Sequence, residues 1–256
     1  MRQLTAFIKK ECMEVIRTGK FTVLMIVFIL FGVMNPAMAK ITPWLLESMS
    51  DSLSDAGFMV TEVEVDALTS WTQFYKNVPM ALIVFLLMFS GILTVEYQKG
   101  TLINMITKGL ARWKVIAAKF LIMLGLWTIG YWMCYGITYA YNEYFWDNSI
   151  AKDVMFAAFC FYFMGVWLIA LVMLMSVVFS SNSAVAVGTG VGFFLFYLVG
   201  ILPDVKEYLP VRLMDASELR SGIGKTEDYM WALAVTVILT VVSIAIAVVG
   251  FNKKNV

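Results

Sequence analysis

Six apolar runs of about 20 residues each decide which fold this sequence can adopt. A helix rising 1.5 Å per residue needs about 20 residues to cross a hydrocarbon layer of roughly 30 Å. Backbone groups inside that layer find no water, so each run must be helical. The runs cover residues 21–39, 78–95, 115–140, 154–180, 184–202 and 229–251. The sequence therefore predicts an all-α polytopic membrane protein whose six transmembrane helices form a single domain over residues 1–256.

Composition agrees with this class and argues against several activities. Hydrophobic residues make up 61% of the chain and charged residues 14%, whereas soluble domains are nearer half and a quarter. There is no histidine, which removes the commonest metal ligand and general base. Cys12, Cys134 and Cys160 lack the close spacing of a zinc site or disulfide framework. The net charge of +1 gives no reason to expect nucleic acid. We expect no catalytic site, cofactor or metal in this chain.

Basic residues are distributed unevenly between the segments that join the runs. With the N-terminus inside, the inner segments hold 12 of the 19 Lys and Arg residues but only 3 of the 18 acids. Cytoplasmic loops carry such an excess of Lys and Arg. We therefore expect a multi-pass protein of the plasma membrane with both termini in the cytoplasm.

Three outer segments follow from this orientation: a short loop at residues 142–153 and two longer segments. Residues 41–77 form a long acidic segment, and Trp71, Phe74 and Tyr75 near its end are expected to anchor the chain at the membrane interface. Residues 203–228 form the second, where Pro203 and Pro210 interrupt a semi-apolar stretch that we expect to return toward the membrane.

The first 20 residues predict an amphipathic helix that lies along the inner interface. Apolar side chains recur at helical spacing, with charged residues on the other faces. The apolar positions are Leu4, Phe7, Ile8, Cys12, Val15 and Ile16. Such a helix could serve only as a lipid anchor, or it could also contact a partner protein. The pattern leaves both readings open.

The inner segment between the second and third runs contains a second short amphipathic stretch. After a break at Gly100, apolar residues line one side and basic residues lie beside them. The apolar positions are Leu102, Met105, Ile106 and Leu110, and the basic ones are Lys108, Arg112 and Lys114. A docking element for a cytosolic partner would have this form. A basic connector that follows the charge rule of membrane loops would have it too.

The order Glu96, Gly100-Thr101, Thr107, Arg112 and Lys119 resembles the ABC-2 type permeases of ATP-binding-cassette transporters. The resemblance implies six spans, an N-terminal interfacial helix and a short cytoplasmic coupling helix between spans 2 and 3. It also implies partners: an ATPase subunit that binds ATP and Mg, a second permease subunit in a homodimer or heterodimer, and membrane lipid, in a bacterial cell. The residues assigned to ATPase coupling by this resemblance are Glu96, Gly100, Thr101, Leu102, Met105, Lys108 and Arg112.

Residues 221–226 end in Gly-Lys-Thr like a phosphate-binding loop. A full motif needs a glycine where this chain has Leu219, and our orientation places the segment outside the cell. The ATPase is therefore expected to be another chain.

Two stripes inside the spans have alternative readings. Ala184, Gly188 and Gly192 place a small residue at every fourth position of the fifth run, which suits close helix packing. They could pack within one protomer, or border a two-fold interface or the transport path. In the third run, Trp127, Tyr131 and Tyr135 share one face, either for ordinary packing or as a wall along a substrate path.

The function expected from these features is the permease subunit of an ABC transporter. By analogy it exports an amphipathic substrate, such as an antimicrobial peptide, a lipid-linked molecule or a drug, and a separate ATPase drives it. The alternatives are a membrane scaffold or sensor that uses the acidic outer loop, and a secondary transporter. The secondary transporter is disfavoured because ionisable residues are nearly absent from the middle of the runs.

Overall fold

The computed structural model describes residues 2–48, 65–107, 109–222 and 224–254, and no strand occurs among them. Six helices are long and apolar enough to cross a membrane. This confirms the predicted all-α class with six candidate spans. The elements are α1 (Arg2–Arg17), α2 (Lys20–Ser48), α4 (Ala67–Phe89), α5 (Thr94–Gln98), α6 (Thr101–Thr107), α7 (Arg112–Phe145), η1 (Asn148–Ile150), α8 (Val154–Val178), α9 (Asn182–Val199), α10 (Pro203–Lys206), η2 (Pro210–Ser221), η3 (Thr226–Tyr229) and α11 (Met230–Lys253).

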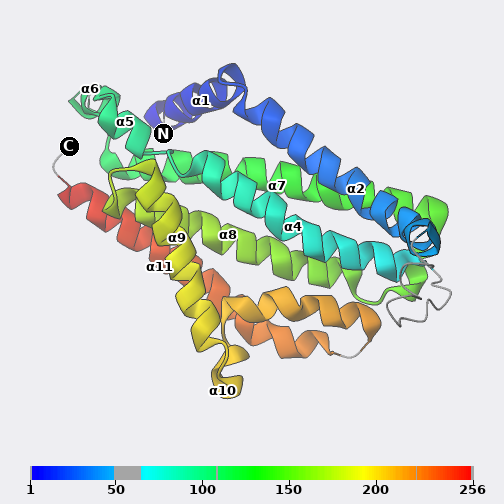
Figure 1. Cartoon of the computed structure of the whole chain (residues 1–256). Helices are drawn as coiled ribbons and strands as arrows, with labels where there is room; N and C mark the ends of the chain where they lie inside the picture. The colour runs from blue at the N-terminus through cyan, green and yellow to red at the C-terminus, as the bar shows by residue number, and fades with distance from the viewer. Residues whose placement is uncertain (1, 49–64, 108, 223, 255–256) are drawn as a thin grey trace.

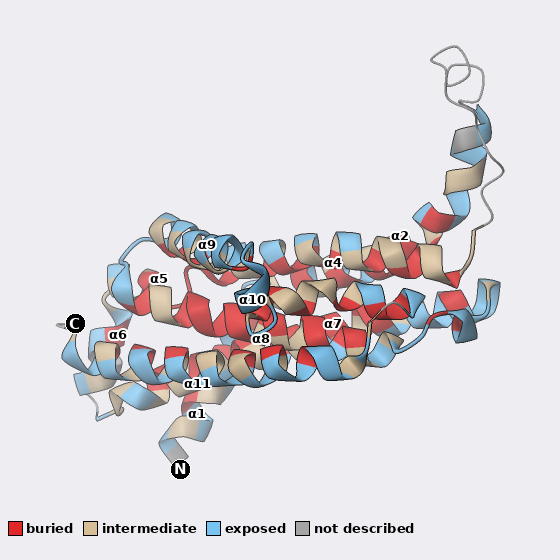
Figure 2. Cartoon of the chain, turned by 90° about the horizontal axis from the view of Figure 1, so that it is seen from below, coloured by how far each residue is buried: buried red, intermediate tan, exposed pale blue. Residues whose placement is uncertain are grey.

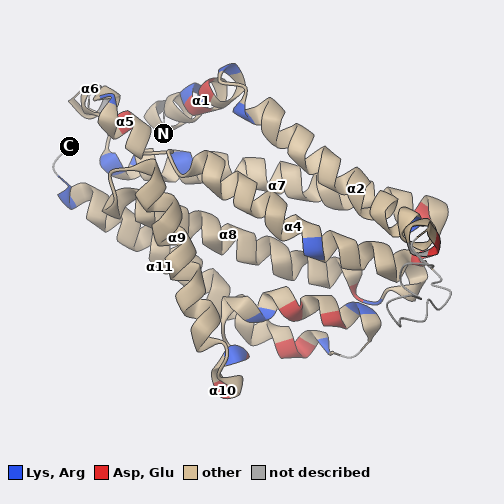
Figure 3. Ribbon diagram, in the orientation of Figure 1, with Lys and Arg blue, Asp and Glu red and all other residues tan. Residues whose placement is uncertain are grey.

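The long helices form a bundle around α8 (Figure 1). Helix α8 is the most buried span and packs against α7, α9, α11 and η2. Helix α9 crosses the bundle at a steep angle and is the least buried span. Both termini lie at the same end as α5 and α6. Buried residues follow the inner sides of α4, α7 and α8 (Figure 2), and charged residues gather toward the ends of the helices (Figure 3).

Helix α2 continues through Pro36 because a neighbouring helix replaces the missing hydrogen bond. A proline has no backbone N–H, so the carbonyl of Gly32 loses its helical donor. The hydroxyl of Thr138 on α7 donates to that carbonyl over 3.1 Å. The Thr138 hydroxyl also accepts from the side-chain amide of Asn35 at 3.2 Å, and the side-chain amide of Asn77 on α4 donates to the side-chain oxygen of Asn35 at 2.9 Å. The chain of bonds ties α2, α4 and α7 together.

Helix α4 begins eleven residues earlier than the predicted second span. Asp66 caps its N-terminus by accepting a hydrogen bond from the Thr69 N–H at 2.8 Å. Residues 67–77, expected to belong to the outer segment, therefore form the first turns of α4. Trp71 and Phe74 are fully buried within the protein, and the Trp71 indole donates to the side-chain oxygen of Asn148 at 3.0 Å. The expected interfacial anchors are thus part of the helix packing; residues 49–64 lie outside the described residues.

The segment of residues 203–228 returns alongside the bundle. The 3-10 helix η2 packs against α8 and α11 near the start of α11 (Figure 1). Its buried side chains include Leu213, Ala216 and Leu219. The semi-apolar character of residues 203–228 is explained by this packing.

Candidate functional site

The segment that joins the second and third spans folds into two short helices at the end that holds both termini (Figure 1). Gly100 adopts a φ of +64° between α5 and α6, and Gly109 a φ of +87° before α7. These backbone conformations are left-handed and favour glycine. The two turns set α6 apart from the long helices as a separate element.

A cluster of five charged side chains joins this segment to the rest of the protein. Lys119 on α7 is 2% exposed and lies 2.9 Å from a Glu11 oxygen and 3.1 Å from a Glu96 oxygen. Lys10 lies 2.8 Å from carboxylate oxygens of Glu11, Glu14 and Glu96. The cluster therefore links α1, α5 and α7. We refer to Lys10, Glu11, Glu14, Glu96 and Lys119 as the ion cluster.

Electrostatics favour the charged forms of Lys10 and Glu14 on α1. Burial acts to lower the pKa of Lys10, but its hydrogen bonds to three carboxylates outweigh burial and raise that pKa above the ordinary value. Burial acts to raise the pKa of Glu14, but the hydrogen bond from Lys10 lowers it overall. The carboxylates of Glu11, Glu14 and Glu96 lie close enough to share a cation, and the two lysine ammonium groups already reach them. The arrangement suits a structural ion-pair network.

Hydrogen bonds connect the same segment to the turn between α8 and α9. The Gln98 amide donates to the Ser180 carbonyl over 3.3 Å, and the Thr94 hydroxyl donates to the Asn182 side chain. A Cβ added at Gly91 would lie 2.9 Å from the Asn182 amide nitrogen. Gly91 therefore lies against the Asn182 side chain, which would have to shift to admit a side chain at position 91.

Arg112 joins the start of α7 to the end of α11. Its guanidinium donates to the carbonyls of Phe251 at 3.0 Å and Asn252 at 3.3 Å, and also to that of Lys254. The Lys254 ammonium in turn donates to the Val177 carbonyl at the end of α8 over 2.7 Å. These cations satisfy carbonyl groups that a helix end leaves without partners.

The structure separates the residues predicted for ATPase coupling by their exposure. Glu96 belongs to the ion cluster, and Leu102 is fully buried, so neither presents a free surface. Thr101 is exposed. The side chain of Met105 and the whole of Lys108 lie outside the described residues. Among the described side chains of α6, the exposed apolar one is Ile103, at 44%, which the sequence analysis did not select.

The signal for Ile103 was present in the helical spacing. Leu102 and Ile106 lie four residues apart and share the inner face of α6. Ile103 and Thr107 share the next face, which is exposed. In a short segment that is apolar on both faces, the sequence alone does not tell which face turns inward.

The small residues of the fifth span pack within the protomer. A Cβ added at Gly188 would lie 2.5 Å from the Phe179 ring, and one at Gly192 would lie 3.1 Å from Leu171. Both glycines therefore face α8, whereas Ala184 is half-buried. The contacts favour the packing reading over an interface at these residues.

The aromatic stripe of the third span is also inside the bundle. Trp127 and Tyr131 are fully buried, and Tyr135 nearly so. The Trp127 indole donates to the Tyr162 carbonyl at 3.2 Å, and the Tyr131 hydroxyl donates to the Ala158 carbonyl at 2.8 Å. The polar atoms of Trp127 and Tyr131 thus bond to α8, and the contacts favour the packing reading here as well.

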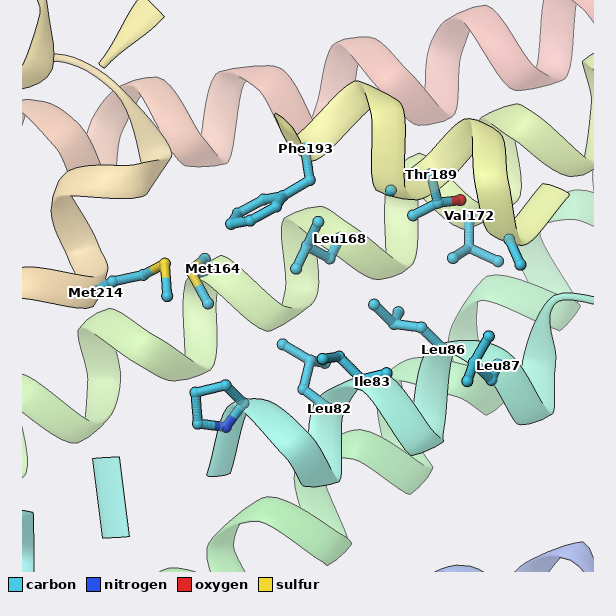
Figure 4. A pocket seen from close by; sticks show the side chains of 13 residues that line it. Leu82, Ile83, Leu86, Leu87, Met164, Leu168, Val172, Thr189, Phe193 and Met214 are labelled. Carbon is cyan, nitrogen blue, oxygen red and sulfur yellow. The ribbon is translucent and has the colours of Figure 1, made fainter. Parts of the chain in front are cut away.

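A groove of about 380 Å³ lies between α4, α8 and α9 (Figure 4). Its one hydroxyl, on Thr189, is already bonded to the Val185 carbonyl at 2.8 Å, so the wall presents hydrocarbon and thioether groups. The residues labelled along it are Leu82, Ile83, Leu86, Leu87, Met164, Leu168, Val172, Thr189, Phe193 and Met214. The groove can hold an apolar molecule or the apolar part of one, and its lining offers no catalytic group.

Comparisons with known proteins give a family over nearly the whole length. The model of the ABC-2 family transporter protein matches residues 5–256. The chain is similar to an uncharacterized transmembrane protein, YxlG, of Bacillus subtilis (strain 168), with 23% identity over 261 residues that cover 99% of this chain and 98% of the relative. No solved structure matches the chain.

Proposed function

This chain belongs to the ABC-2 family of transporter proteins, as a membrane-spanning permease subunit, and we propose that it exports an amphipathic substrate under the power of a separate ATPase. The ATPase would bind ATP and Mg, and two permease subunits would enclose the path. We place the protein in a bacterial plasma membrane with both termini in the cytoplasm. The positions of the termini at one end of the bundle, together with the basic inner segments, support this orientation.

The ion cluster is the observation that carries the proposal. It fastens α5 to α1 and α7, and two further hydrogen bonds fasten α5 to the turn between α8 and α9. A displacement of α6 by a cytosolic partner would therefore move the inner ends of several spans together. Packed helices of this kind switch between discrete arrangements rather than deform continuously. ATP can shift the protein from one arrangement to the other only if it binds one of them more tightly.

The exposed face of α6 is the surface that we assign to the ATPase. Ile103 and Thr101 are exposed on it, and a short helix with an apolar side chain can seat in a groove of a partner. Leu102 and Glu96 would act behind this surface, by holding α6 and α5 in place. This replaces the expectation that Leu102 itself makes the contact.

The groove between α4, α8 and α9 supports an amphipathic cargo. Its apolar wall suits the hydrocarbon part of an antimicrobial peptide, a lipid-linked molecule or a drug.

Helix α9 also carries an apolar face that no described element covers, which would allow a second subunit to close the path. The exposed residues of that face are Val187, Val191, Phe194, Leu195 and Leu198.

The proposal is tested by isolating the protein in mild detergent and identifying its partners by mass spectrometry. We expect an ATP-hydrolysing subunit to copurify with the native chain. Ile103→Asp should remove it, because the charge would have to be buried in the contact. Ile150→Asp is the matched control, since Ile150 is 52% exposed on η1 and belongs to the other end of the bundle.

Two results would count against this function. One is a native chain that never retains a nucleotide hydrolase under conditions in which the six spans stay folded. The other is equal loss of the partner in both variants, which would mean that α6 is not the contact.

A further inference from the structure

A second apolar groove, of about 190 Å³, lies between α1, the start of α2 and α7. On α7 its lining runs from Leu121 to Ile129, a helix rise of about 12 Å. That length is close to the depth of one leaflet in a hydrocarbon layer of roughly 30 Å. The lining residues are Cys12, Val15, Ile16, Phe21, Leu121, Ile122, Gly125, Leu126 and Ile129.

The groove is open at Gly125. A Cβ added there would meet no described atom within 4 Å, and Gly125 is exposed. Apart from the thiol of Cys12, every side chain around it is a hydrocarbon. Such a surface recognises an apolar chain and has nothing with which to orient a polar ligand.

Helix α1 adds positive charge beside this groove. Lys9, Cys12, Met13 and Ile16 follow at spacings of three and four, so they share one face, and all are exposed. Lys9 and the exposed Arg17, one residue beyond Ile16, form no ion pair with any described residue. The two acids of α1 lie elsewhere on the helix, where Lys10 holds them in the ion cluster. An apolar face with unpaired basic residues is typical of helices that bind anionic lipid.

We propose that this groove binds one acyl chain of an anionic glycerophospholipid, whose headgroup lies against Lys9 and Arg17. The groove supplies the apolar contact and the two cations supply the preference for negative charge. The site is separate from the groove between α4, α8 and α9, and it does not depend on the proposed transport function. It would fix α1, and through the ion cluster α5, at the inner interface.

The acyl contact is tested with phosphatidylglycerol that carries a photoactivatable diazirine in one acyl chain, in nanodiscs of phosphatidylcholine. We expect cross-links on the α1 and α7 peptides that line the groove. Gly125→Leu should reduce them about tenfold, because it displaces roughly two methylenes of the bound chain. Gly136→Leu is the matched control, since Gly136 is also an exposed glycine of α7 with nothing within 4 Å of an added Cβ.

The headgroup contact is tested by comparing the same probe in phosphatidylglycerol and in phosphatidylcholine. The native chain should favour phosphatidylglycerol, and Lys9→Gln or Arg17→Gln should each reduce that preference by about fivefold. Lys99→Gln is the control, because Lys99 is an exposed residue of the same end of the bundle with no ion pair among the described residues.

Three results would overturn the proposal. The first is equal labelling of the groove in the native chain and in Gly125→Leu. The second is equal labelling by the two lipids in the native chain. The third is efficient cross-linking between Cys12 residues of two copies by a short bismaleimide, which would make the groove an interface between chains.

Discussion

Lys119 is the residue on which the inner end of the bundle depends most. Its ammonium is almost completely buried and lies between Glu11 of α1 and Glu96 of α5. Charges so far from water are tolerated only when they are paired. Removal of the lysine would leave two buried carboxylates without that partner.

We expect Lys119→Met to destabilise the protein by about 3–5 kcal/mol, the usual cost of breaking a buried ion pair from one side. The triple variant with Glu11→Gln and Glu96→Gln should recover part of the loss, because it removes two buried carboxylate charges that Lys10 alone would have to balance. Thermal unfolding in detergent would measure both. Lys99→Met is the control. An equal loss of stability in this variant would show that the ion cluster contributes no more to stability than an exposed lysine does.

The hydroxyl of Thr138 is expected to contribute to stability, because Pro36 leaves the Gly32 carbonyl without its helical donor and the hydroxyl replaces that donor. Thr138→Val should cost about 1 kcal/mol, as hydrogen bonds between membrane helices do. With Pro36→Ala in place the cost should shrink, since the new N–H can reach Gly32. The stabilities of the two single variants and of the double variant are measured by unfolding in denaturing detergent. Thr236→Val, which removes only a bond within α11, should change little, and additivity of the two substitutions would refute the explanation.

At the scale of helices, the close contact of α7 with α8 depends on Gly165. An added Cβ there would lie 2.4 Å from the Trp127 ring. We expect Gly165→Ala to lower stability by about 1–3 kcal/mol through overpacking. Gly136→Ala should be neutral or slightly stabilising, because an exposed helical glycine has space for a methyl group. Thermal shift measurements compare the two; a neutral Gly165→Ala would mean that α7 and α8 pack less tightly than described.

The six spans could be predicted from the sequence because each is a long apolar run, and the hydrocarbon layer allows only a helix there. The start of α4 could not be predicted in this way. Residues 67–77 look like a loop beside an acidic stretch, and only the packing of Trp71 against Asn148 on η1 shows that they are a buried part of the helix.

Which face of a span turns inward was the harder question. In water, an apolar face marks the core, but in lipid both the inner and the outer faces are apolar. Trp127 and Gly188 therefore suited a path or an interface as well as packing, and it is their contacts with Tyr162 and Phe179 that favour packing. The ion cluster was missed for a related reason: Glu96 and Lys119 are distant in sequence, and nothing in the local pattern pairs them with Glu11.

At the scale of the whole molecule, the orientation that we propose rests on the distribution of charge and on the shared end of the two termini. Single cysteines at Ser221 and Thr107, both exposed positions, test it in a chain without other cysteines. In intact cells an impermeant maleimide should label the cysteine at 221 and not the one at 107. Permeabilised cells, in which both should react, are the control, and labelling of 107 in intact cells would reverse the topology.

The account depends on movement that begins at α6 and is driven by ATP in another chain. Its most direct test is transport by the copurified complex in sealed vesicles, with a cationic amphipathic peptide, a fluorescent lipid and a hydrophobic dye as probes. We predict ATP-dependent accumulation of at least one probe, abolished by Ile103→Asp and retained in Ile150→Asp. Accumulation that continues without ATP, or that is the same in Ile103→Asp as in the native complex, would contradict the account.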